Sequence, residues 1–183
     1  MSTSFTSFTS FTDSKELRNA VKVFDGPETP DRYFIINKYG PINLWNVENI
    51  TDMSHLFFNC HTFNYNIGDW NVGKVINMHY MFYDCNMFNQ DIGRWDVGNV
   101  IEMEMMFSYC YMFNQDVSDW NVKNVESMSA MFFDCHKFNQ NISKWNVEKV
   151  INMSYMFNGC HKFDTNINNW NLQNVQNVYK MFN

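Results

Sequence analysis

The tryptophans of this chain recur at a constant interval. Consecutive tryptophans are 25 residues apart, and the five cysteines follow the same interval. A unit of this length cannot bury its own apolar face, so units must stack on one another and share a core built of residue columns. The two sets of columns are Trp45, Trp70, Trp95, Trp120, Trp145 and Trp170, and Cys60, Cys85, Cys110, Cys135 and Cys160. We therefore expect recurring residues to be structural, and only departures from the repeat to indicate function.

The apolar spacing within one unit predicts its conformation. Val47 follows Trp45 by two residues, as on one face of a strand, and the strand is expected to end near Ile50. Later positions have the three-and-four spacing of a short helical segment: Met53, Leu56, Phe57 and Cys60. The sequence therefore predicts an α/β repeat solenoid similar to a leucine-rich repeat, with short parallel strands and short helical turns in each unit. A mostly-β solenoid is the alternative.

Amide and thiol side chains also form columns. One column directly follows a phenylalanine in each unit and predicts a turn with an amide ladder between units: Asn64, Asn89, Asn114, Asn139 and Asp164. Cysteines on successive units have parallel Cβ directions, a poor geometry for disulfides, so we expect buried free thiols. A zinc site at Cys135, His136, Cys160 and His161 would need four converging ligands, whereas each histidine should point away from its cysteine. No metal or other cofactor is expected.

The segment before the repeats predicts a cap. Residues 1–12 are a low-complexity Ser-Phe-Thr segment that we expect to be flexible. Residues 13–41 are expected to cover the stack with a helix, which begins at the capping pair Asp13 and Glu16, and a strand at Tyr33 to Ile36.

The repeat array spans residues 42–183 and stops part-way through a unit. Met181 and Phe182 would then lie on an open apolar edge, which we expect to dock onto another subunit. The alternative is that the last half-unit closes the stack by itself.

Aromatic residues recur on the side of the helical segment opposite the core. Rings aligned on an otherwise exposed surface are typical of protein-binding hot spots. The candidate partner-binding positions are His55, Phe58, Tyr80, Tyr83, Met105, Phe133 and Tyr155. The alternative is that these side chains fold back and pack on neighbouring units.

Charge and motifs exclude several function classes. The net charge is −6, and no cluster of Lys and Arg suits a phosphate backbone, so nucleic acid is not expected as a partner. The start of the chain lacks the features of a signal peptide or membrane span, which predicts an intracellular or virion location without membrane insertion. The sequence holds no phosphate-binding glycine loop, nucleophile elbow or HExxH, so we expect no enzymatic activity.

The units FNQDIGRWDVGNV and MFFDCHKFNQNISKWNVEKV resemble the BspA-like leucine-rich-repeat surface proteins, over about Leu17 to Phe182. The resemblance implies a leucine-rich-repeat-like solenoid used for display, adhesion or assembly, with no catalytic residues. We expect no signal peptide or anchor in this chain, which would set it apart from the secreted members. We expect a non-enzymatic scaffold that binds a protein partner or copies of itself. The alternatives are a minor-capsid-type structural component of a large DNA virus particle and a surface adhesin.

Overall fold

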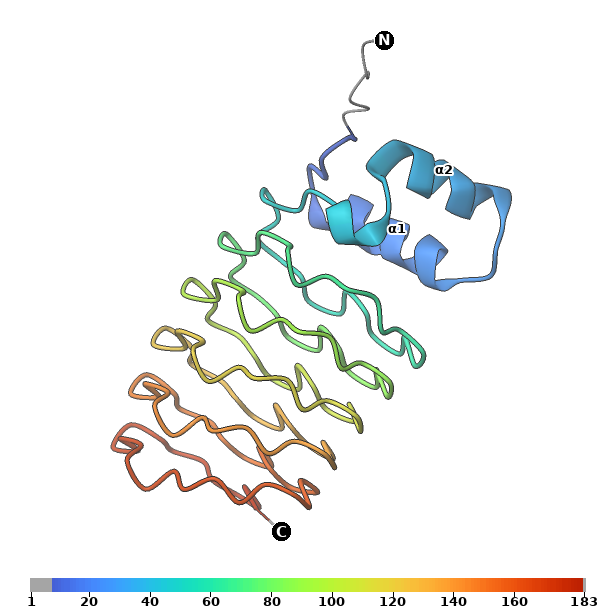
Figure 1. The fold of residues 1–183 in the computed structure, drawn as a ribbon. Coiled ribbons are helices and arrows are strands. Elements are labelled where there is room, and N and C mark those ends of the chain that lie inside the picture. The colour runs from blue at the N-terminus through green and yellow to red at the C-terminus, as the bar shows by residue number, and fades with distance from the viewer. Residues whose placement is uncertain (1–7, 183) are drawn as a thin grey trace.

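The chain folds into an elongated stack of coils with a helical cap at its N-terminal end (Figure 1). This computed structural model describes residues 8–182. Its helices are α1 (Ser14–Asp25), α2 (Pro30–Tyr39) and the short 3-10 helix η1 (Ile42–Leu44). From η1 onward the coils follow one another in sequence order toward the C-terminus, so residues one repeat apart lie side by side.

The prediction of an α/β solenoid is wrong. The structure is only 14% helical and 3% strand, too little for a helix and a strand in every unit. Both α-helices belong to the cap. Among residues 8–182, β-type pairing between coils is limited to isolated parallel bridges in one column: Asp52, Asn77, Glu102, Ser127, Asn152 and Asn177.

Hydrogen bonds between coils explain why the helical segments are absent. The N–H groups of Met53 and His55 donate to carbonyl groups of the next coil at 2.9 Å, whereas Leu56 N–H donates to the Met53 carbonyl three residues back. His55 and Asn59 have positive φ angles of 57° and 61°. An α-helix needs each N–H to bond four residues back and excludes left-handed residues. The segment is therefore a run of tight turns, although Met53, Leu56 and Phe57 face the core as expected.

Turns likewise replace the expected strands beside the tryptophans. Trp70 N–H donates to the Ile67 carbonyl at 3.1 Å, and Val75 N–H to the Val72 carbonyl at 2.8 Å. The side chain of Asn66 accepts the Gly68 N–H at 2.9 Å. Asparagine followed closely by glycine favours such side-chain-closed turns over extended backbone. Tryptophan and valine share the core face here because two successive turns bring them there.

The aromatic columns form the core. The Trp45 and Trp70 rings stack at 6.1 Å between centroids, and the Phe57 and Phe82 rings at 5.1 Å. Each tryptophan from Trp70 onward also donates its indole N–H to a carbonyl of the coil before it, as Trp120 does to Ile92 at 3.1 Å. The columns thus combine apolar burial with a satisfied polar group in each coil.

Thiol and amide columns bond between coils as well. The cysteines are free, and the Cys85 thiol donates to the Phe57 carbonyl at 2.9 Å. Cys60 is only half-buried, yet burial still raises the pKa of its thiol to about 12. The Asn64 side chain accepts the backbone N–H of Asn89 at 2.9 Å, and the later coils repeat this bond. The predictions of free thiols and an amide ladder are therefore confirmed.

The cap differs from the sequence-based expectation at two places. The segment expected as a strand lies within α2, because Thr29 accepts the Arg32 N–H, Pro30 occupies the first turn, and Gly40 ends the helix with a φ of 81°. These capping signals outweigh the strand propensity of the intervening aromatic and β-branched residues. The expected flexible segment is ordered over residues 8–12, where the Phe11 ring is buried against Tyr39; its residues 1–7 lie outside the described residues.

One carboxylate links the parts of the cap. Glu16 accepts hydrogen bonds from the Tyr39 hydroxyl, from Lys38 at 3.0 Å and from the Thr12 N–H at 3.2 Å. The Tyr39 hydrogen bond is the main cause that lowers the Glu16 pKa from 4.5 to about 2, with Lys38 and Thr12 adding to it against the opposing effect of burial. The folded state therefore favours the ionised carboxylate, which joins α1 to the end of α2.

We expect Glu16→Gln to lower the free energy of unfolding by about 1–2 kcal/mol at pH 7, because a charge-assisted contact is lost at a partly screened site. The depressed pKa means that this stabilisation is present above about pH 4.5 and is lost as the pH falls toward 2. Urea unfolding between pH 2 and 7 should show a smaller acid loss in the variant. Exposed Glu28→Gln is the control, and an equal acid loss in both variants would contradict the assignment.

Candidate functional site

A stripe of partly exposed aromatic side chains runs along one side of the stack. We call it the aromatic stripe, and its rings belong to His55, Phe58, Tyr80, Tyr83, Tyr109, Phe133 and Tyr155. It follows the turn segments in which the first left-handed residue of each coil is His55, Tyr80, Met105, Ala130 or Tyr155. A positive φ is uncommon outside glycine, and its repetition here aligns the side chains of this column from coil to coil.

Rings in the N-terminal half of the stripe stack face to face. The His55 and Tyr80 rings are 5.1 Å apart at an angle of 4°, and the Phe58 and Tyr83 rings are 5.0 Å apart at 9°. The Phe58 side chain is still 38% exposed. Packing on neighbouring coils and exposure to solvent therefore coexist, and the stack holds these rings as a preformed surface.

Rings in the C-terminal half meet edge to face. Tyr109 lies at 80° to Tyr83 and at 72° to Phe133, and Phe133 lies at 70° to Tyr155. A hollow of about 260 Å³ opens among these rings, with Met105, Ser108 and Ala130 completing its lining. The stripe thus changes from a flat stack to a concave, largely apolar surface.

The structure brings most of the sequence-predicted partner-binding residues together in this stripe and separates two from it. Met181 is buried, and its carbonyl accepts the Phe157 N–H at 2.8 Å, so its side chain is not the exposed edge that was expected. Phe182 is 48% exposed and stacks on Phe157 at 5.6 Å. Tyr109 was not predicted from the sequence, because it lies one position after the column that carries Tyr83 and Phe133. The signal that could have found it is a tyrosine in a column where other coils have Asn59, Asp84 and Asp134.

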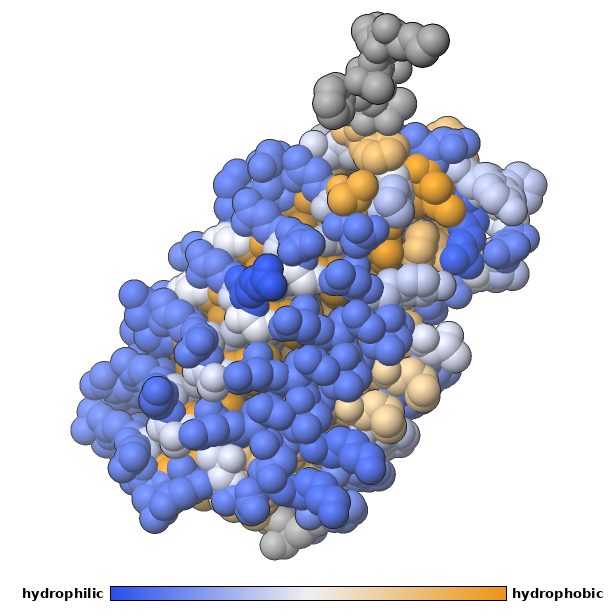
Figure 2. Space-filling view, viewed as in Figure 1, coloured by the Kyte–Doolittle hydropathy of each residue, from blue (hydrophilic) through white to orange (hydrophobic). Residues whose placement is uncertain are grey.

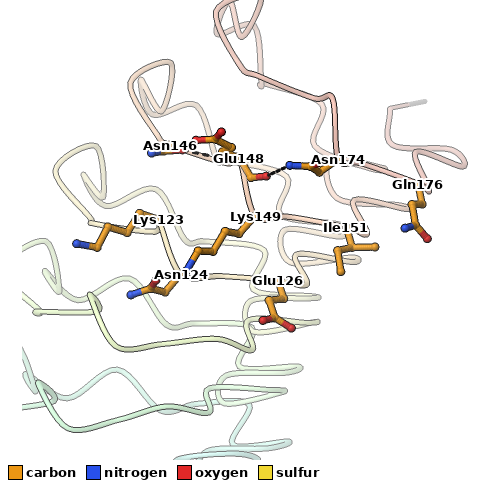
Figure 3. A pocket seen from close by; sticks show the side chains of 9 residues that line it. All are labelled: Lys123, Asn124, Glu126, Asn146, Glu148, Lys149, Ile151, Asn174 and Gln176. Carbon is orange, nitrogen blue, oxygen red and sulfur yellow. Dashed lines mark hydrogen bonds between the residues drawn. The ribbon is translucent and has the colours of Figure 1, made fainter.

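A second hollow is polar and lies along the segment that follows the tryptophans in the C-terminal coils. It measures about 790 Å³, and its lining includes Lys123, Glu126, Glu148 and Lys149 (Figure 3). Lys149 donates to the Asn124 side chain at 2.8 Å, and Asn174 donates to the Glu148 carbonyl at 2.8 Å. These groups bond along the stack rather than converge on one point, and their charges balance. The polar hollow is therefore a weaker candidate site than the aromatic stripe.

The other groups considered for chemistry do not converge. The Cys135 thiol is buried and donates to the Phe107 carbonyl at 2.9 Å, whereas His136 stacks outside on Tyr111 and His161. Among residues 8–182, no group of three or more His, Cys, Asp or Glu side chains is arranged to hold a metal ion.

Burial raises the pKa of the Glu102 carboxyl group, and the nearby carboxylates of Glu104 and Glu126 raise it further.

The surface of the coils is mainly hydrophilic on the face that Figure 2 shows, and apolar residues gather over the cap. The described helices are short, at 12 residues in α1 and 10 in α2. None of the helices in residues 8–182 has the length and apolar character needed to cross a bilayer.

The stacked coils and their columns define a repeat protein with an aromatic surface. Residues 31–135 and 115–183 match the family described as "Mycoplasma protein of unknown function, DUF285". The chain belongs to this family. No curated protein and no solved structure matches this chain significantly.

Proposed function

We propose that this protein is a non-enzymatic binding scaffold whose aromatic stripe docks a partner protein. One observation carries the proposal: rings such as Phe58 and Tyr83 are held in place by stacking on each other, yet they remain partly exposed to solvent. Aromatic side chains supply large contact areas at interfaces and are frequent hot spots. Rings that are ordered before binding also lose little conformational freedom when a partner arrives.

The stack suits this role because its core and its surface are built by different columns. The buried columns carry the stability of each coil, so the outward positions are free to vary without loss of the fold. The stripe uses this freedom, since its positions change from histidine and phenylalanine to tyrosine, methionine and alanine along the chain. A surface that varies on a constant frame can distinguish one partner from another.

Replacing three stripe residues tests the proposal. We expect the Phe58→Ser, Tyr83→Ser, Phe133→Ser variant to lose a partner that the wild-type protein captures from its source cells, with at least about a tenfold loss of affinity because hot-spot rings contribute about 2 kcal/mol or more each. The captured protein would then be purified, and its dissociation constant measured with each variant. Circular dichroism and thermal unfolding would confirm that the variant remains folded.

A matched triple variant in the polar hollow, Lys123→Ser, Asn146→Ser, Gln176→Ser, provides the control. These three side chains are exposed, and they lie away from the stripe. We expect it to bind the partner as the wild-type protein does. Equal binding by both triple variants, or loss of binding only in the polar-hollow variant, would overturn the proposal.

We also propose that the chain is related to the BspA-like repeat proteins. The support is the agreement of the unit FNQDIGRWDVGNV and its repeats with those proteins, in register along the array. This relationship is consistent with a binding role rather than a catalytic one. It leaves the partner to be identified from the chemistry of the stripe itself.

A further inference from the structure

The hollow in the aromatic stripe arises where the chain departs from its own repeat. Tyr80, Met105 and Tyr155 place long side chains at the first left-handed position of their coils, whereas Ala130 places a methyl group there. Ala130 lines the hollow of about 260 Å³ together with Met105 and Tyr155, the side chains of the preceding and following coils. Residues that recur are structural, so this substitution is the kind of departure that indicates function.

Aromatic rings supply the walls of the hollow. Tyr83, Tyr109, Phe133 and Tyr155 line it, and successive rings meet at 70–80°. The faces of aromatic rings carry negative partial charge, so a cation among several rings is attracted by all of them. The Ser108 hydroxyl is buried and donates to the Ala130 carbonyl at 2.6 Å, so its proton is not offered to an anion.

Carboxylates add to the negative potential beside these rings. Asp84 and Asp134 stand at the same position as Tyr109 in the preceding and following coils. Burial raises the pKa of the Tyr109 hydroxyl, and the charges of Tyr83, Asp134 and Asp84 raise it further, so both carboxylates act on this hydroxyl. An imidazole lies beside each carboxylate, His61 at 3.3 Å from Asp84 and His136 at 3.9 Å from Asp134, and it offsets the negative charge only when it is protonated.

We propose that this hollow receives an arginine side chain of the partner protein, an inference that rests on the proposed docking function of the stripe. A planar guanidinium stacks on aromatic rings and is more weakly hydrated than an ammonium group, so arginine loses less than lysine on entering an apolar hollow. Its aliphatic stem would pack on Met105 and Ala130, which line the hollow. Asp84 and Asp134 stand beside the lining rather than in it, so they would attract the charge from outside the hollow. A neutral apolar side chain would fill the space without using the carboxylates.

A small probe tests the inference without the partner. The full chain would carry a ¹³C-methyl label on methionine and be titrated with N-acetylarginine methylamide at pH 8, where histidine side chains are ordinarily neutral. We expect the Met105 methyl signal to shift, and the neutral citrulline analogue to bind at least about tenfold more weakly, because it cannot form a cation–π contact with the rings. The inference would be overturned if the citrulline analogue bound as tightly as the arginine probe. It would also be overturned if the corresponding tyrosine derivative, a neutral aromatic probe, bound more tightly than the arginine probe.

Two variants localise the binding. Ala130→Tyr fills the hollow with the residue that the same column already holds at Tyr80 and Tyr155, whose φ angles of 56° and 58° are close to the 51° of Ala130. We expect it to lower the affinity for the arginine probe at least about tenfold. Tyr155→Leu, which removes one wall ring and keeps aliphatic bulk, should lower it several-fold even if Ala130→Tyr folds poorly. Thr62→Tyr, at an exposed position outside the hollow, should leave it unchanged.

The outcomes separate the inference from the function on which it rests. Wild-type probe affinity in folded Ala130→Tyr, or in Tyr155→Leu, would overturn the arginine site. Loss of the partner in the stripe triple variant would still support docking in that case. Probe binding that Ala130→Tyr removes, together with partner capture unaffected by the stripe triple variant, would support the cation site and overturn the docking function.

Discussion

Trp120→Ala should lower the free energy of unfolding by about 3–5 kcal/mol, the largest effect that we expect from a single substitution in the array. Trp120 is 3% exposed, its ring lies 6.2 Å from that of Phe107, and its indole N–H donates to the Ile92 carbonyl of the preceding coil at 3.1 Å. The substitution therefore leaves a cavity and also removes a buried hydrogen bond between coils, although the Ile92 carbonyl still accepts the Trp95 N–H at 3.1 Å. Urea unfolding followed by circular dichroism would measure the change.

Trp120→Phe is the matched control, because it keeps a ring in the column and removes the indole donor. We expect a smaller loss of about 0.5–1.5 kcal/mol, the net contribution of one hydrogen bond, because the Ile92 carbonyl keeps the Trp95 N–H as a donor. An unfolding midpoint that is the same for the wild-type protein and Trp120→Ala would contradict the view that the tryptophan column holds adjacent coils together.

Phe11→Ala should lower the stability of the cap by about 3–4 kcal/mol. The Phe11 ring is fully buried, stacks on Tyr39 at 4.0 Å and contacts Trp45 at 5.1 Å. Stacked repeats interact mainly with their nearest neighbours, so the effect should be concentrated in the cap and the first coil. Hydrogen exchange measured by mass spectrometry should show faster exchange in residues 14–45, with little change beyond Trp95.

Phe8→Ala is the control from the same Ser-Phe-Thr segment. The Phe8 side chain is 39% exposed, and its ring rests against Gly40. Its removal should cost about 1 kcal/mol or less, as is usual for a partly exposed residue. Equal exchange in the Phe8 and Phe11 variants would show that the segment does not anchor the cap.

These two phenylalanines show where sequence reasoning reached its limit. The repeated triplets give Phe8 and Phe11 the same local sequence, which predicts flexibility for both. Their different burial depends on α2 and the first coil, which place Tyr39 and Trp45 around Phe11. The aromatic stripe was predicted in the same partial way. The sequence indicated most of the rings that face outward but not Tyr109, and the edge-to-face arrangement of Tyr109 and Phe133 follows from packing between coils.

Three features could be read from the amino-acid sequence alone: the interval of the repeat, the columns that fill the core, and departures from the repeat such as Ala130. These follow from composition and spacing, because stacked units must bury the same positions in each unit. The conformation of each unit, in contrast, depends on contacts between coils. The Met53 N–H can bond within its own coil as part of a helix or reach the Asn77 carbonyl of the next coil, and the structure shows the second choice. Local periodicity cannot distinguish the two, since both place Met53 and Phe57 in the core, and the bond to a neighbouring coil exists only once that coil is in place.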